Sequence, residues 1–354
     1  EDAINGATGG KGLAGIDQTK PLGLYWNATG SGMPVVFLPI TDADALKELL
    51  TDLTPDQYRE IRYRAERALA LNGNAYSLQL FHLGSYHRYP VRVHLVEDGN
   101  AREILYDPSL FDFGAVQVTD GLPPETGFAG FRIHYVFEDG GVPQELLTFL
   151  GASYFRAAAR DTRFGISARG LALETGLGKP EEFPSFTQFW VFQPSDPRGA
   201  LQICALWDSP GVAGAYRFDL SPRDGTVVAV DASLFFRADV SQVGIAPLTS
   251  MYFFGANDRL GVDDSRGEVH DSEGLSIWRA TGEALWRPLV NPRTLHVSVF
   301  ADENLRGFGL LQRTRDYMRY GDLDARFDRR PNLWIEPKGA WGKGSVRLIE
   351  IPIQ

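Results

Sequence analysis

The chain has 354 residues, of which 44% are hydrophobic and 23% are charged, and its formal net charge is −10. This length allows one large domain or two ordinary ones with a sizeable core. The acidic excess argues against general nucleic-acid binding, which needs a basic surface, and no apolar run is long enough to predict insertion into a membrane. The single cysteine, Cys204, excludes an intramolecular disulfide and a multi-cysteine metal centre.

The first part of the chain predicts an arm and a hairpin. Residues 1–20 are small, polar and rich in glycine, which is typical of a flexible arm. The segment 21–40 has two apolar runs around turn-forming residues and predicts a β-hairpin.

Helical spacing of apolar residues follows in two segments. It occurs at 41–50 and returns at 54–71, where Thr54 and Gln57 fit a capping box around the proline of the first helical position. We therefore expect helix to be concentrated between Asp42 and Leu71.

From residue 74 onward the apolar period changes to two, as in strands. The run 89–96 alternates Val91, Val93 and Leu95 with polar residues, as expected for a sheet with one solvated face. About a dozen such runs occur without the strand–helix alternation of a parallel sheet. They predict an all-β fold, a large antiparallel, supersandwich-like β-sandwich with a short helical N-terminal segment. The predicted strands lie in 74–81, 89–96, 130–137, 186–193, 200–207, 215–220, 225–239, 250–255, 295–300, 307–312, 333–337 and 345–353.

Three patterns that could indicate a phosphate or metal site do not meet the chemistry of such sites. The glycine-rich segment Gly6–Gly12 lacks the preceding strand and the Ser/Thr of a phosphate loop. His82 and His87 have the wrong spacing for two ligands on one helix face or on alternate strand positions. The aspartates of 322–328 lack the glycine and the terminal glutamate of a calcium loop. We expect no metal and no cofactor.

The segment 263–287 combines acidic residues with tryptophans and arginines. Indole faces pack on the apolar faces of pyranose rings, carboxylates and arginines bind ring hydroxyls, and two carboxyl groups can cleave a glycosidic bond. Tryptophans on strands are also common in cores, and acidic loops are commonly just solvated. Both interpretations, core packing and sugar contact, stay open for Trp278 and Trp286.

Several long blocks of the sequence resemble the periplasmic glucan biosynthesis proteins G and D of Gram-negative bacteria, the MdoG/OpgG–OpgD family. The resemblance runs from about Leu53 to Gln354. It is carried by FLGASYFRA (149–157), GISARGLALET (165–175), EEFPSFTQFWVF (181–192), GIAPLTSMYFFG (244–255), VHDSEGLSIW (269–278), WRPLVNP (286–292), GFGLLQR (307–313) and WGKGSVRLIEIP (341–352).

The resemblance implies a domain organisation and a location. Residues 53–354 correspond to the family's glucan-processing β-sandwich, and residues 1–52 remain an unassigned arm, hairpin and helix. The family's C-terminal immunoglobulin-like domain is absent from this sequence. The family is periplasmic, so the resemblance also implies a periplasmic location.

The resemblance also implies an activity on β-1,2-linked glucan, as an inverting glycoside hydrolase or a transglycosylase. One family catalytic carboxylate falls on Asp271. The other lies a few residues beyond the block Glu350–Pro352 and has no counterpart before Gln354. Beside Asp271, we expect His270 and Arg287 to bind sugar hydroxyls and Trp278 and Trp286 to stack on sugar rings. The alternative is a non-catalytic glucan-binding or scaffolding module that works with a membrane glucan synthase.

Overall fold

The computed structural model describes most of the chain. The described residues are 23–25, 35–37, 53–73, 75–116, 124–178, 180–223, 225–259 and 261–353. The predicted arm (1–20) and the predicted helix at 41–50 lie outside these residues. Strands β1 (Gly23–Tyr25) and β2 (Val35–Phe37) pair antiparallel, which confirms the predicted hairpin.

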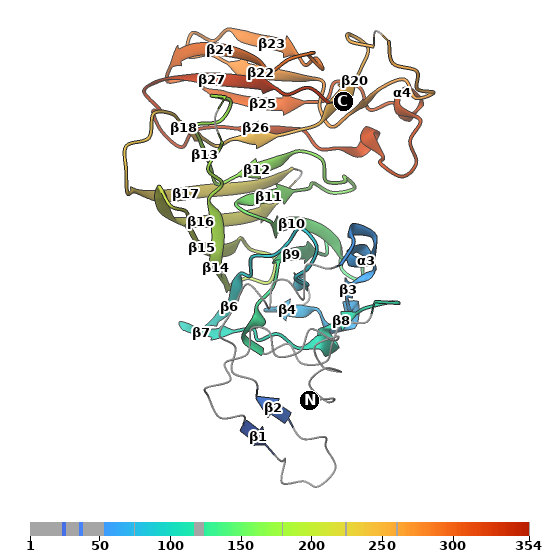
Figure 1. Cartoon of the computed structure of the whole chain (residues 1–354), viewed down its shortest axis with the longest axis vertical. Helices are drawn as coiled ribbons and strands as arrows, with labels where there is room; N and C mark the ends of the chain where they lie inside the picture. The colour runs from blue at the N-terminus through green and yellow to red at the C-terminus, as the bar shows by residue number, and fades with distance from the viewer. Residues whose placement is uncertain are drawn as a thin grey trace.

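Two large sheets form the middle of the molecule (Figure 1). The seven-stranded sheet has the order β19 (Leu248–Thr249), β12 (Ser167–Arg169), β11 (Tyr154–Ala157), β10 (Gln144–Leu150), β9 (Gly130–Tyr135), β5 (Tyr76–Phe81) and β4 (Leu69–Leu71). The six-stranded sheet has the order β17 (Thr226–Phe236), β16 (Val212–Pro222), β15 (Leu201–Asp208), β14 (Ser185–Phe192), β6 (Arg92–Glu97) and β7 (Asn100–Glu103). The predicted all-β sandwich is confirmed.

Aromatic side chains hold these two sheets face to face. Phe149 of the seven-stranded sheet is 1% exposed, and its ring centroid lies 5.0 Å from those of Phe189 and Phe218 in the six-stranded sheet. Within its own sheet it stacks on Phe131 at 5.1 Å. The alternation predicted for 89–96 is also confirmed, because Val91, Val93 and Leu95 are all buried in the same core.

One pairing differs from the predicted antiparallel pattern. Strands β14 and β6 run parallel, with Trp190 opposite His94. A parallel pair needs a long crossover, and here the connection contains much of the seven-stranded sheet. Local alternation cannot reveal this, since it is the same for both directions.

A smaller layered unit follows in the C-terminal part, drawn at the top of Figure 1. Its four-stranded sheet has the order β23 (Ala284–Pro288), β22 (Gly274–Trp278), β25 (Gly307–Leu311) and β26 (Leu333–Ile335). Residues of this sheet share a core with the pair β24 (His296–Glu303) and β27 (Lys343–Glu350). Further pairs are β13 (Leu171–Leu173) with β18 (Val243–Ile245), β20 (Tyr252–Phe254) with β21 (Val269–His270), and β3 (Arg62–Tyr63) with β8 (Phe111–Asp112).

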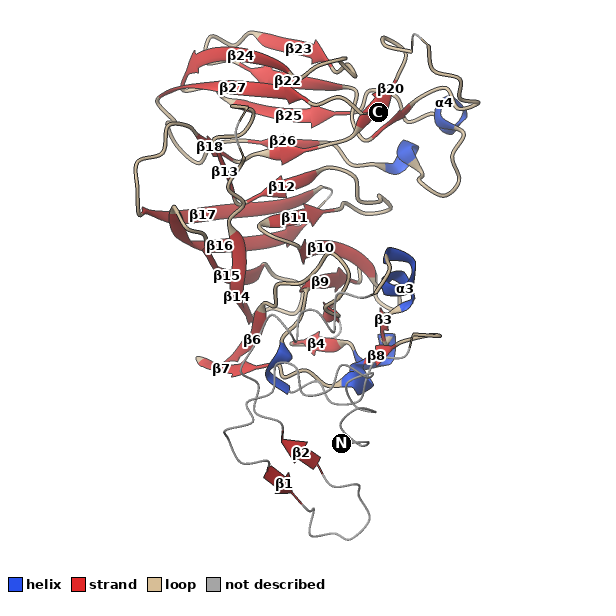
Figure 2. Ribbon diagram, viewed as in Figure 1, coloured by secondary structure: helices blue, strands red, loops and turns tan. Residues whose placement is uncertain are grey.

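Helical structure is scarce among the described residues (Figure 2). The helices are α3 (Pro55–Glu60) and α4 (Tyr317–Tyr320), with 3₁₀ turns η1 (Ala65–Arg67), η2 (Pro108–Leu110), η3 (Pro124–Thr126) and η4 (Phe327–Arg329). Within this part of the chain no helix is both long and apolar enough to cross a membrane.

The predicted capping box is confirmed, but the predicted helix ends early. The Thr54 hydroxyl accepts a hydrogen bond from Gln57 N at 3.2 Å, and the Gln57 side chain accepts one from Thr54 N at 2.9 Å. The helix stops at Glu60, and Leu71, expected in a helix, lies fully buried in strand β4 opposite Tyr76. The helical prediction for 61–71 was therefore wrong, because pairing with β5 and burial outweighed local helical spacing.

Candidate active site around Asp271

Asp271 lies in the short connection between β21 and β22. Its N–H donates to the carbonyl of Met251 at 2.8 Å, which fixes the backbone. Its carboxylate is 13% exposed and lies 3.3 Å from Nε of Arg330. Gly165 allows this close packing, since a Cβ there would lie 3.1 Å from the Asp271 carboxyl and 2.9 Å from Arg330 Cδ.

Burial dominates the electrostatics of this carboxyl group. Burial raises the pKa of Asp271, while the positive charges of Arg330, Arg156 and His270 act in the opposite direction. A desolvated carboxyl group beside cations is the kind of perturbed titratable group that is common at catalytic sites.

Arg156 connects Asp271 to the seven-stranded sheet. Its Nε donates to the Ser167 hydroxyl at 2.7 Å, which fixes the guanidinium beside β12. The same charge acts on His87, whose pKa is lowered by burial and further by Arg156. His87 closes a tight turn with Gly84 through two backbone hydrogen bonds of 2.9 and 3.0 Å. The charges that act on Asp271 therefore come from β11 as well as from the C-terminal unit.

Sequence reasoning missed Arg330 and Arg156. They lie far from Asp271 along the chain, and neither belongs to a motif with a known role. The blocks of family resemblance include Arg156, but a block does not indicate which of its residues faces a site.

His270 is placed differently from the expectation. Its ring is fully buried, with Nε2 2.8 Å from a Glu268 oxygen and Nδ1 3.3 Å from Gln312 Oε1. It also stacks on Tyr252 at 5.5 Å. The predicted contact with sugar hydroxyls is not available to a buried ring with both nitrogens partnered. His270 instead supports the backbone that carries Asp271.

Glu268, His270 and Glu273 form a buried cluster whose potential ligand atoms lie within 4.8 Å of one another. Arg319 donates two hydrogen bonds to Glu268, one of them at 2.7 Å. Burial opposes ionisation of Glu273, but hydrogen bonds from the Arg313 backbone and side chain outweigh it and hold the pKa of Glu273 below its ordinary value. Cationic partners thus already compensate the carboxylates, and the cluster forms an ion-pair network rather than an open metal site.

The remaining predicted residues lie on β22 and β23, and the alternation of these strands separates them. Trp286 pairs with Ser276, which places it on the same sheet face as Trp278. Arg287 pairs with Leu275, a core residue, and therefore lies on the opposite, core-facing side. Trp278 is 41% exposed, so the sugar-contact interpretation remains open for it.

The structure does not bring these tryptophans to Asp271. Gly165, which lies against Asp271, is followed by Ile166, which shares a core with Leu275 and Ile277. The segment that packs against Asp271 thus leads into the core side of the four-stranded sheet, whereas the two tryptophans are on its outer side.

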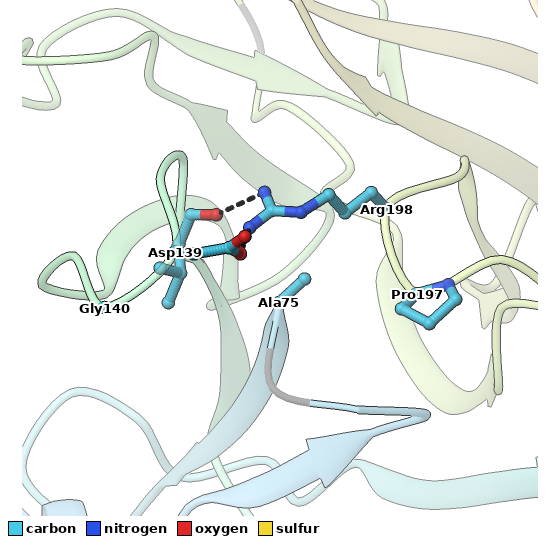
Figure 3. A pocket seen from close by; sticks show the side chains of 6 residues that line it. Ala75, Asp139, Gly140, Pro197 and Arg198 are labelled. Atoms are coloured by element: carbon cyan, nitrogen blue, oxygen red, sulfur yellow. Dashed lines mark hydrogen bonds and ion pairs between the residues drawn. The ribbon is translucent and has the colours of Figure 1, made fainter.

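A separate shallow hollow of about 180 Å³ is lined by Ala75, Val136, Asp139, Gly140, Pro197 and Arg198 (Figure 3). Arg198 crosses it, donating to the Val136 carbonyl at 3.0 Å and pairing with Asp139. None of the predicted site residues lines this hollow. Through these contacts Arg198 links the turn that contains Asp139 to its own turn.

These features define an all-β sandwich protein with a buried carboxyl group held among arginines at the junction of its two units. Comparison with known proteins identifies the family of this chain. The model of the family "Periplasmic glucan biosynthesis protein, MdoG" matches residues 40–354. The chain therefore belongs to this family of periplasmic glucan biosynthesis proteins.

Similar proteins carry consistent names. "Glucans biosynthesis protein G" of Rhodopseudomonas palustris (strain BisA53) is 48% identical over 310 residues, 87% of this chain and 61% of that protein. "Glucans biosynthesis protein G" of Shewanella baltica (strain OS155 / ATCC BAA-1091) is 47% identical over 88% of this chain and 58% of its own length. "Glucans biosynthesis protein D" of Stenotrophomonas maltophilia (strain K279a) is 47% identical over 86% of this chain and 57% of its own length. The chain thus spans roughly three fifths of these relatives.

Proposed function

We propose that this chain provides a glucan-processing domain that works in the periplasm on β-1,2-linked glucan, by inverting hydrolysis or by transfer. The observation that carries the proposal is the Asp271 carboxyl group, which is largely buried, has a raised pKa and faces Arg330 at 3.3 Å. Ordinary surface aspartates are neither desolvated nor fixed in this way.

In an inverting mechanism one carboxylate activates water and a second carboxylic acid protonates the leaving glycosidic oxygen. Asp271 supplies one of these groups. Arg330 and Arg156 stabilise its ionised form and offer N–H donors to sugar oxygens near the reacting bond. His270 acts indirectly, through the backbone that it supports.

A second candidate function is a glucan-binding or scaffolding module that cooperates with membrane glucan-synthesis machinery. The observation in its favour is the contact of the Asp271 carboxylate with Arg330 at 3.3 Å, since a carboxylate paired with a guanidinium is suited to binding sugar hydroxyls. An inverting site needs a second carboxyl group about 6.5–9.5 Å from the first. In this interpretation Asp271 binds sugar hydroxyls without transferring a proton.

The test is Asp271→Asn, which keeps the shape of the side chain but removes its proton transfer at neutral pH. Linear, unsubstituted β-1,2-glucan is incubated with each protein, and products are followed by thin-layer chromatography and reducing-end release. We expect the rate to fall by ~10²–10⁴, with glucan affinity retained because the amide still hydrogen-bonds to hydroxyls.

Asp263→Asn is the matched control, because Asp263 is an exposed aspartate of a nearby loop. It should keep both rate and affinity. Equal turnover by folded Asp271→Asn and wild type would refute the catalytic role. Binding by the wild-type chain without shorter or rearranged products would instead support the module.

A further inference from the structure

The outer face of the four-stranded sheet carries three tryptophans in register. Across the strands, Trp286 on β23 is opposite Ser276 on β22, Ser276 is opposite Gly309 on β25, and Gly309 is opposite Trp334 on β26. Trp278 lies two residues further along β22 and so points to the same side. We call Trp278, Trp286 and Trp334 the tryptophan platform.

Glycines let the platform lie flat. A Cβ at Gly274 would fall 2.2 Å from Trp286 Cζ2, so this indole lies directly on the Gly274 backbone. A Cβ at Gly307 or Gly309 would fall 2.7 or 2.8 Å from the ring of Trp334. The indoles of Trp286 and Trp334 therefore lie directly on the backbone of the sheet.

The platform is long enough for more than one sugar ring. Neighbouring strands lie about 4.8 Å apart, so the backbones of Trp286 and Trp334 are separated by roughly 14 Å across three strand spacings. The exposed Trp278 lies between the two outer rings, beside this row.

Arginines stand over the platform. Arg306 lies 5.3 Å from the ring centre of Trp278, and Arg313 lies 5.4 Å from that of Trp286. The Arg313 side chain is 58% exposed and is also paired with Glu273 at 3.3 Å. Its guanidinium is therefore held beside the indole, where its remaining N–H groups can donate to the hydroxyls of a bound sugar.

The charge around the platform favours a neutral ligand over a polyanion. Arg279 is paired with Glu283 at 3.2 Å and with Asp302 at 3.4 Å, and the Trp334 indole donates to Glu336 at 3.0 Å. Carboxylates thus line the same edge as the arginines.

We propose that the tryptophan platform is a second carbohydrate-binding surface, on the outer side of the four-stranded sheet, which holds a neutral glucan chain by stacking its pyranose rings on the three indoles. The nature of the ligand rests on the proposed function, whereas the position of the surface rests on sheet register. In this proposal the platform binds one part of the glucan polymer, and Asp271 acts on a separate part of the polymer.

Trp278→Ala tests the surface with little risk to folding, since this side chain is 41% exposed. Ser276→Arg is a second variant that places a bulky side chain in the middle of the row. Affinity for linear β-1,2-glucan is measured by calorimetry and by retardation in glucan-containing gels, at low and physiological salt. Each variant should bind the polymer roughly five- to tenfold more weakly, with little dependence on salt.

Trp341→Ala is the matched control, because Trp341 is similarly exposed (38%) but lies outside the four-stranded sheet. It should bind as the wild type does. Loss of binding in the platform variants would support the platform even if no turnover is found. Unchanged binding by both Trp278→Ala and Ser276→Arg would overturn it. Steeply salt-dependent binding of an anionic polymer in place of glucan would overturn it as well.

Discussion

The buried ion-pair network around Glu268, His270 and Glu273 allows a quantitative prediction for the stability of the variant Glu268→Gln. Glu268 is 1% exposed and accepts hydrogen bonds from Arg319 and from the buried ring of His270. Removing one partner of a buried pair typically costs 3–5 kcal/mol. Because the Arg319 side chain is 49% exposed, water can solvate it in the variant, and we expect the lower end, about 3 kcal/mol.

This free energy converts into a measurable change in melting temperature. The entropy of unfolding is about 2.1 cal/mol/K per residue, so for a chain of this length about 3 kcal/mol lowers Tm by roughly 4 °C. Circular dichroism in the strand region, at one scan rate for all proteins, measures the change. The matched control is Glu283→Gln, whose carboxylate is 59% exposed in its pair with Arg279 and should change Tm by less than about 1 °C. Equal changes in the two variants would refute the structural role of the network.

Two further perturbations address the core and the pH dependence. Phe149→Ala should lower the free energy of unfolding by about 3–5 kcal/mol in denaturant titrations. Phe235→Ala should lower it little, because this side chain is 64% exposed. Similar denaturation midpoints for the two variants would contradict the aromatic core. Arg330→Gln removes a charge that lowers the pKa of Asp271, so the limb of the pH–rate profile set by Asp271 should move to higher pH. Movement of the acidic limb would identify Asp271 as the base, and movement of the alkaline limb would identify it as the acid. A profile identical to that of the control variant Arg329→Gln would exclude electrostatic coupling between Arg330 and Asp271.

Features that depend on neighbouring residues could be predicted from the sequence alone. Alternation over 89–96 predicted which side chains of β6 are buried, because successive side chains of any strand point to opposite faces. Thr54 and Gln57 predicted the start of α3, because a capping box is completed within four residues. The family blocks located Asp271 in the chain, but not its surroundings.

Features that depend on partners distant in the sequence could not be predicted without the complete fold. The segment 61–71 is helical by its spacing, yet β4 forms because β5 is available as a partner and the core accepts Leu71. Spacing could show that Trp286 and Arg287 point to opposite faces, but not that the core covers the face with Arg287.

The site itself is also a product of the tertiary structure. Arg330 and Arg156 come from distant segments, and the pKa of Asp271 depends on the burial that this meeting creates. Desolvation and Coulomb interaction depend on distance in space, and the chain encodes that distance only through its complete fold.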